Sequence, residues 1–115
     1  MPGRAEVVDL SPFLQAAGDG VHWSLGEPGD LNVNLVRLGA ERAMEEHAND
    51  AVDIVVIVLG GSGELVVDGV GVPLATDVVA HVPKGAARSI RAGRQGLSYL
   101  TVHRRRDPLT VGGRR

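Results

Sequence analysis

The chain is organised around two stretches, GAERAMEEHANDAVDIVVIVLG at residues 39–60 and DVVAHVPKGAAR at residues 77–88. In the first, a polar turn leads into a segment at 53–59 that is apolar and largely β-branched after Asp53, which predicts a strand buried on both faces. In the second, a strand ends in a Pro-Lys-Gly turn at 83–85. Most side chains that can bind or react lie at the ends of these two strands, so we expect any functional site there.

Outward from these stretches, short apolar segments alternate with turn signals along almost the whole chain. Gly-Gly-Ser-Gly at 60–63 is interpreted as a hairpin turn, and Asp-Gly at 68–69 as another. Residues 40–50 are interpreted as an extended turn region, because their apolar residues form no helical stripe. Ser-Pro at 11–12 predicts the start of one short helix. The expected strands are 21–25, 31–38, 53–59, 64–68, 70–74, 77–82, 89–91 and 97–103.

This pattern predicts an all-β protein, a sandwich or barrel with at most one short N-terminal helix. Its 115 residues suffice for one domain with one core. We expect an N-terminal arm with the helix at 1–20, the barrel at 21–104 and a basic tail at 105–115. The absence of cysteine excludes disulfides and thiol catalysis. Without a membrane-length apolar run or a signal-peptide core, we expect a cytoplasmic protein with no membrane partner.

Charge is distributed unevenly along the chain. Residues 1–80 carry thirteen acidic and three basic residues, and residues 81–115 carry one acidic and nine basic residues. Such asymmetry can mark a nucleic-acid-binding arm. We favour the simpler interpretation that late strands pair with early ones, so that opposite charges meet across the sheet. Tyr99 is the only aromatic residue of the basic segment and offers little surface for stacking bases, so we expect no nucleic-acid partner.

The spacing of glycine and polar residues in the two stretches resembles the two sequence motifs of the cupin family. The matching positions are Gly39, Glu45, His47, Asp53 and Gly60 in the first motif and Asp77, Pro83, Gly85 and Arg88 in the second. The resemblance spans about residues 31–103. It implies an antiparallel jelly-roll β-barrel with a pocket inside, usually assembled as a homodimer.

The departures from the motifs concern the metal ligands. Metal-binding cupins hold a divalent ion with two histidines and a glutamate from the first motif and one histidine from the second. Only His47 stands unchanged at such a position, while Glu45 and Asp53 replace the other two first-motif ligands. Arg88 replaces the second-motif histidine. A guanidinium has no lone pair to donate and keeps its positive charge, so Arg88 cannot ligate a metal.

Two hypotheses follow from these substitutions. In the one we favour, the barrel has no cofactor and Arg88 takes the place of the ion, facing Glu45 and Asp53. Such a protein would bind a small, anionic molecule. In the alternative, Glu45, His47 and Asp53 form a weak divalent-metal site with water, and Arg88 turns away. That protein would be a small isomerase, cyclase or metal-dependent dioxygenase that uses His47 and Asp53.

Other polar positions are candidates for the pocket wall. The strand at 31–38 carries two asparagines, the second being Asn34, on a face that suits either a partly hydrated pocket or solvent. His81 lies among small apolar residues and faces either the barrel interior or the other side of its sheet. His103 shares a face with Tyr99 and Thr101 in a polar stripe. His103 lies either at the mouth of a pocket or at a surface strand end, and we favour the surface. The predicted pocket residues are Glu45, His47, Asp53, Arg88, Asn34 and His81.

Overall fold

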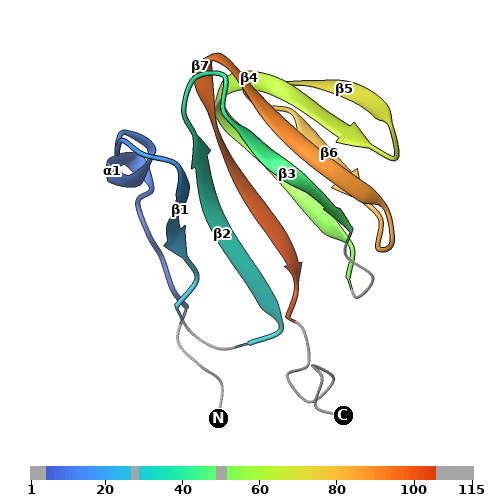
Figure 1. Ribbon diagram of the computed structural model, residues 1–115. Coiled ribbons are helices and arrows are strands. Elements are labelled where there is room, and N and C mark those ends of the chain that lie inside the picture. The colour runs from blue at the N-terminus through green and yellow to red at the C-terminus, as the bar shows by residue number, and fades with distance from the viewer. Residues whose placement is uncertain (1–4, 27–28, 49–51, 106–115) are drawn as a thin grey trace.

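One short helix and seven strands make up the described part of the chain, which is residues 5–26, 29–48 and 52–105 of a computed structural model; for residues 46–48 only the backbone is described. All strand pairs are antiparallel, so the fold is the nearly all-β architecture that the sequence predicts (Figure 1). The elements are α1 Ser11–Leu14, β1 Gly20–Ser24, β2 Leu31–Leu38, β3 Ala43–Ala48, β4 Ile54–Val67, β5 Val70–Ala75, β6 Val79–Val82 and β7 Ala87–Arg104.

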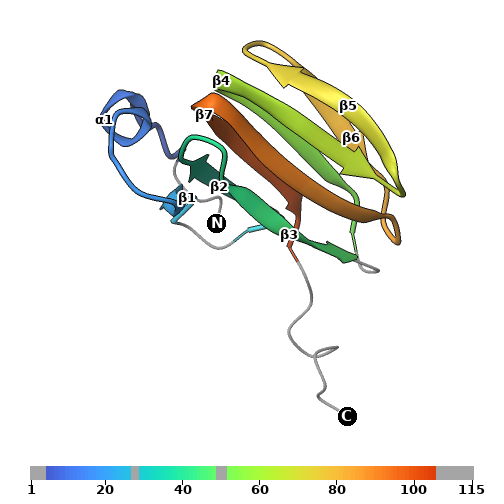
Figure 2. The same ribbon diagram turned by 45° about the horizontal axis from the view of Figure 1, so that its top comes forward.

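The strands form two layers because β4 and β7 are long enough to take part in both. The first part of β4 pairs with β6 and its second part with β5. The first part of β7 pairs with β3 and its second part with β2, beyond which β1 forms the edge. Since β4 and β7 also pair with each other, one layer is β1-β2-β7-β4-β6 and the other is β3-β7-β4-β5 (Figures 1 and 2).

The glycine-rich segment at 60–63 is not the predicted hairpin turn, because it lies inside β4, at a bend. The register between β4 and β7 shifts on both sides of Gly61. Gly61 has a φ of 79°, and a Cβ there would overlap the carbonyl oxygen of Gly96. A Cβ on Gly63 would overlap the carbonyl oxygen of Arg91. These glycines therefore let two backbones approach closely where the paired strands pass from one layer to the other.

The bend also changes which positions of β4 and β7 face the interior. Before it, even-numbered residues reach the core or its cavity, and after it odd-numbered residues do. In β4 the inward-facing positions are 54, 56 and 58 before the bend and 65 after it. In β7 they are 88, 90 and 92 before the bend and 97, 99, 101 and 103 after it. Alternation counted from one side of the bend therefore assigns the wrong face on the other side.

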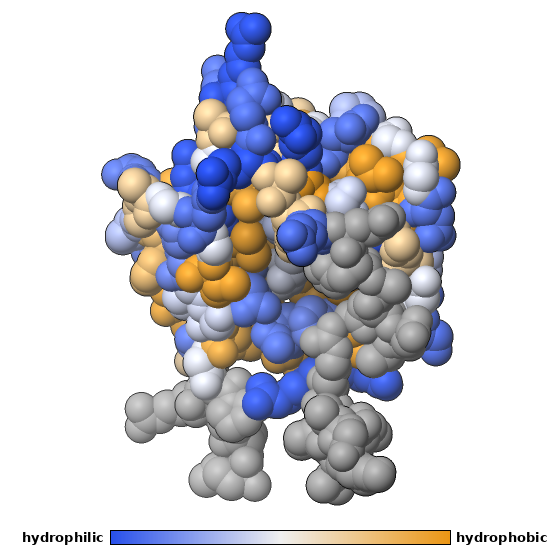
Figure 3. Space-filling view, viewed as in Figure 1, coloured by the Kyte–Doolittle hydropathy of each residue, from blue (hydrophilic) through white to orange (hydrophobic). Residues whose placement is uncertain are grey.

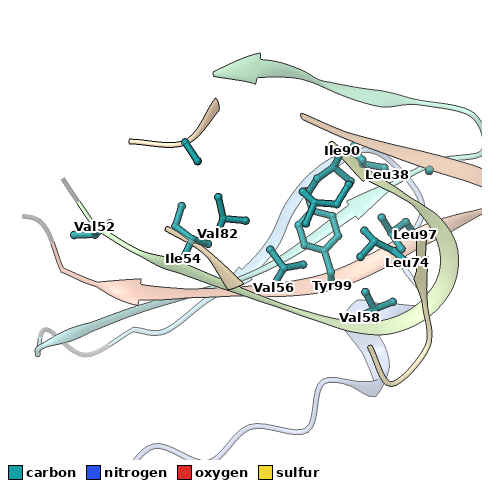
Figure 4. Packing of buried hydrophobic residues seen from close by; sticks show 13 residues of the cluster. Leu38, Val52, Ile54, Val56, Val58, Leu74, Val82, Ile90, Leu97 and Tyr99 are labelled. Carbon is teal, nitrogen blue, oxygen red and sulfur yellow. The ribbon is translucent and has the colours of Figure 1, made fainter. Parts of the chain in front are cut away.

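The hydrophobic core lies between the layers and consists mainly of valine and leucine with Tyr99 among them (Figure 4). The predicted strand at 31–38 coincides with β2. The predicted Asp68-Gly69 turn joins β4 to β5, and both residues have the positive φ that a two-residue hairpin of this kind needs. The segments 89–91 and 97–103, predicted as separate strands, belong to the single strand β7.

The remaining segments lie at the edges of the layers. Residues 43–48 lie in the region predicted as an extended turn, but they form the strand β3 against β7. Helix α1 lies beside β1, at the end of the molecule away from β5 (Figure 2). Hydrophilic and apolar residues are interspersed over the face in Figure 3. No described helix is long and apolar enough to cross a membrane. Except for Arg105, the predicted basic tail lies outside the described residues.

Candidate functional site

A cavity of about 310 Å³ lies between the two layers and combines apolar walls with a few polar groups. Five of its lining residues come from β7, and the exposed Val21 of β1 also lines it. This composition is typical of small-molecule sites. The apolar lining residues are Val21, Val36, Met44, Ile54 and Ile90. The polar lining residues are Asn34, Arg88, Tyr99, Thr101 and His103.

Strand β2 supplies one wall of the cavity through Asn34 and Val36. Ser24 donates a hydrogen bond from Oγ to Oδ1 of Asn34 at 2.6 Å. The Nδ2 group of Asn34 donates to Oδ1 of Asn32 at 3.2 Å. These bonds hold the Asn34 amide in one orientation. Of the two interpretations of the asparagine face, the structure supports the cavity wall.

Arg88 stands near the start of β7, between β3 and β4, and its side chain lines the cavity at only 8% exposure. A guanidinium carries a permanent charge and five N–H donors, more than one protein partner can satisfy. Burial of such a charge is costly unless anions or acceptors surround it. Arg88 therefore gives this cavity, half of whose lining residues are apolar, a fixed positive charge.

Tyr99 is fully buried in the cavity wall, and its hydroxyl has no hydrogen-bond partner among the described residues. Burial raises the pKa of Tyr99 to about 12, and the nearby charge of Arg88 acts in the opposite direction. The hydroxyl therefore keeps its proton near neutral pH and can donate it in a hydrogen bond. A buried polar group left without a partner costs about 1–3 kcal/mol, so a ligand that accepts this bond would be stabilised.

His103 lines the cavity, although of its two predicted positions, pocket mouth and surface strand end, the surface was favoured. Its side chain is 9% exposed, and its Nδ1 lies 2.9 Å from the carbonyl oxygen of Arg104. The change of facing at the bend of β7 turns the whole stripe inward. The stripe itself was visible in the sequence. Whether it faces the interior or the surface depends on the bend in β7, which lies between the two strands predicted at 89–91 and 97–103.

Comparison with known proteins gives matches among solved structures only: no family model and no curated protein sequence matches the chain. The TT1209 protein of Thermus thermophilus aligns at 21% identity with a TM-score of 0.76, covering 90% of this chain and 100% of its own. The cupin domain of Schizosaccharomyces pombe Cnp3 aligns at 21% identity with a TM-score of 0.67, covering 73% of this chain and 63% of its own. The chain has the cupin fold.

A third match supports the same fold, since a Klebsiella pneumoniae protein with a double-stranded β-helix domain aligns at a TM-score of 0.74. It is 12% identical, and the alignment covers 88% of this chain and 90% of that one. This chain spans slightly less than two thirds of the Cnp3 cupin domain. At these identities the likeness concerns the fold alone, so the chemistry of this cupin barrel has to be argued from its own residues.

Asp53 and His81, both predicted to face the pocket, instead meet on the outside of the cupin barrel. Oδ2 of Asp53 lies 3.1 Å from Nε2 of His81, and more than half of each side chain is exposed. The backbone N–H of Lys84 donates to Oδ1 of Asp53 at 2.9 Å. The hydrogen bond from Lys84 lowers the pKa of Asp53 most, and the hydrogen bond with His81 lowers it further. Because Ile54 faces the core, its neighbour Asp53 must face outward, where it holds the turn after β6.

The other predicted pocket residues divide as follows. Arg88 and Asn34 line the cavity. Glu45 is exposed on β3 and is not among the lining residues. The side chain of His47 lies outside the described residues. Asp53 therefore lies apart from Arg88, contrary to the predicted cluster, and Arg88 shares the cavity with Tyr99, Thr101 and His103, which the prediction did not include.

The described residues at the metal positions of the cupin motifs do not fit a metal ion. Arg88 has no lone pair to donate. Asp53 is turned outward and hydrogen-bonded to a backbone N–H and a histidine. Within the described part of the chain, no three histidine, aspartate or glutamate side chains lie close enough together to hold a metal. The chemistry of the cavity is therefore derived from its arginine, tyrosine and histidine.

A second hollow, of about 350 Å³, lies at the outer surface beside Val52, Asp53, Lys84 and Arg104. It is slightly larger than the barrel cavity. Its three charged residues are exposed to water, which weakens the interactions of charges, and Asp53 already has two partners. The barrel cavity is the better candidate site because three of its polar residues, Arg88, Tyr99 and His103, are buried.

Proposed function

We propose that this cupin barrel binds a small anionic molecule in the cavity between its two layers. The proposal rests mainly on Arg88, a permanent cation that lines the cavity at 8% exposure. The planar fork of a guanidinium fits the two oxygens of a carboxylate or phosphate. None of the described lining residues is acidic, so the cavity residues favour a negative ligand.

Two further features support a small ligand in this cavity. The cavity volume of about 310 Å³ lies at the lower end of the range for ligand pockets. The buried hydroxyl of Tyr99 offers a donor in the same space. The enzymatic alternative relied on His47 and Asp53. Asp53 is engaged with the turn at Lys84 on the outer surface, and the side chain of His47 lies outside the described residues.

Calorimetric titration with benzoate and its neutral isostere benzamide tests the proposal. We expect benzoate to bind at least about tenfold more tightly, because a charge-assisted pair with Arg88 contributes about 1.5–3 kcal/mol. Arg88→Gln should remove this difference. Thermal unfolding of the variant without ligand shows whether it is folded, and Arg88→Lys, which keeps the charge but loses the fork, should give intermediate affinity.

Arg91→Gln is the matched control, because Arg91 lies on the same strand three residues later but is exposed. This variant should bind benzoate as the wild type does. Equal affinity for benzoate and benzamide, or a loss of benzoate binding in Arg91→Gln as large as in Arg88→Gln, would contradict the proposal.

A further inference from the structure

The hydrogen bond of His103 determines which of its ring nitrogens carries the proton. Nδ1 lies 2.9 Å from the carbonyl oxygen of Arg104. A carbonyl oxygen only accepts hydrogen bonds, so Nδ1 must be the donor. In the neutral ring, Nε2 then carries a lone pair and acts as an acceptor.

The second nitrogen is left for the cavity. The ring is 9% exposed and lines the same space as Arg88 and Tyr99. Among the described residues, none donates a hydrogen bond to Nε2 of His103. Unlike the Tyr99 hydroxyl, Nε2 is not one of the fully buried atoms that lack a partner, so a donor on a molecule in the cavity can reach it. The cavity therefore contains a lone-pair acceptor as well as donors.

We propose that the ligand of this cavity is a small hydroxycarboxylate, with the carboxylate at Arg88 and the hydroxyl donating to Nε2 of His103. This inference rests on the proposed function, since it assumes that an anion binds at Arg88. It adds the second polar group of the ligand and the residue that recognises it. Val36, Ile54 and Ile90 provide an apolar surface for the carbon skeleton between these groups.

A hydroxyl fits this arrangement better than an amine. An ammonium group would need a carboxylate partner, and none of the described lining residues is acidic. It would also share a small cavity with the guanidinium of Arg88. A hydroxyl is uncharged, donates one hydrogen bond and still accepts others, for example from the Tyr99 hydroxyl.

Titration calorimetry with butyrate and 3-hydroxybutyrate, and with benzoate and 3-hydroxybenzoate, tests this inference. We expect the hydroxylated member of at least one pair to bind about five- to tenfold more tightly, the effect of one good hydrogen bond. His103→Leu should remove that preference and leave the affinity of the unsubstituted acid nearly unchanged. His103→Gln, whose amide oxygen can accept, should retain part of it.

The outcomes separate the two proposals. If butyrate and benzoate bind at Arg88 but the hydroxyl gives no gain in either pair, or the gain persists in His103→Leu, the hydroxycarboxylate inference is wrong and anion binding stands. If none of the four acids binds, the proposed function fails and the inference fails with it.

The protonated nitrogen of His103 can be observed without any ligand. Nitrogen-15 NMR of the folded protein distinguishes the two neutral forms of a histidine ring, and His103→Leu assigns the signal. We expect the neutral form of His103 that is protonated at Nδ1. A ring protonated at Nε2 would contradict the inference, because that nitrogen would then be a donor.

Discussion

Tyr99 shows at the level of one residue how burial controls the chemistry of this cavity. It is the only tyrosine of the chain, and burial raises its pKa from the ordinary 10.0 to about 12. Because the folded-state pKa is the higher one, the stability that this group contributes is fully present below pH 10. It is lost as the pH rises from 10 toward 12, because the unfolded chain releases the proton more readily.

The resulting prediction is a loss of about 3 kcal/mol of folding free energy over that interval, since each pKa unit corresponds to about 1.4 kcal/mol. Ultraviolet difference absorbance reads the ionisation directly, with circular dichroism as the check that the protein is folded. Tyr99→Phe should remove this part of the alkaline destabilisation. A tyrosine that ionises near pH 10 in a protein that is still folded would refute the burial argument.

At the level of elements, the glycines of β4 carry the bend that places the cavity. Gly61→Ala should destabilise the protein by about 3 kcal/mol or more, because it combines an unfavourable positive φ with an overlap between Cβ and the Gly96 carbonyl. Gly60→Ala is the matched control. A Cβ at Gly60 would have no atom within 4 Å, so that variant should change stability by less than about 1 kcal/mol. Equal effects of the two substitutions in urea unfolding would show that the bend tolerates a side chain.

The same bend explains what could and could not be predicted from the sequence. Strand β2 and the Asp68-Gly69 hairpin were predicted correctly, because each depends on local alternation or turn chemistry. The hairpin predicted at 60–63 was wrong. Glycine is also needed where two backbones approach closely, and that approach involves the partner strand β7, which local sequence does not reveal. The apolar run at 53–59 shows no alternation, so it did not reveal that Asp53 faces outward.

His103 is the clearest case of a residue whose role depends on distant structure. Its polar stripe with Tyr99 was recognised, but the facing of that stripe is set by the register shift between β4 and β7. Arg88 lies on the other side of the same bend. Its position in the pocket was predicted from the resemblance to the second cupin motif. Prediction therefore found the cation of the cavity and missed the tyrosine and histidine beside it.

For the whole molecule, the two layers share β4 and β7, so the cavity between them is bounded by strands that belong to both layers. Half of the lining residues come from β7 alone. A ligand that contacts Arg88 and His103 would therefore tie together both ends of one strand. The homodimer and the cytoplasmic location expected from the sequence stay predictions, as does the role of the basic tail.

The most direct test of the central claim, that a small anion binds beside Arg88 inside the barrel, is a high-resolution crystal structure of the protein grown with benzoate. The account predicts benzoate in the cavity, with its carboxylate oxygens within hydrogen-bond distance of the Arg88 guanidinium and its ring against the apolar wall. Benzoate bound only at the outer hollow beside Lys84 and Arg104, with none in the barrel, would contradict it.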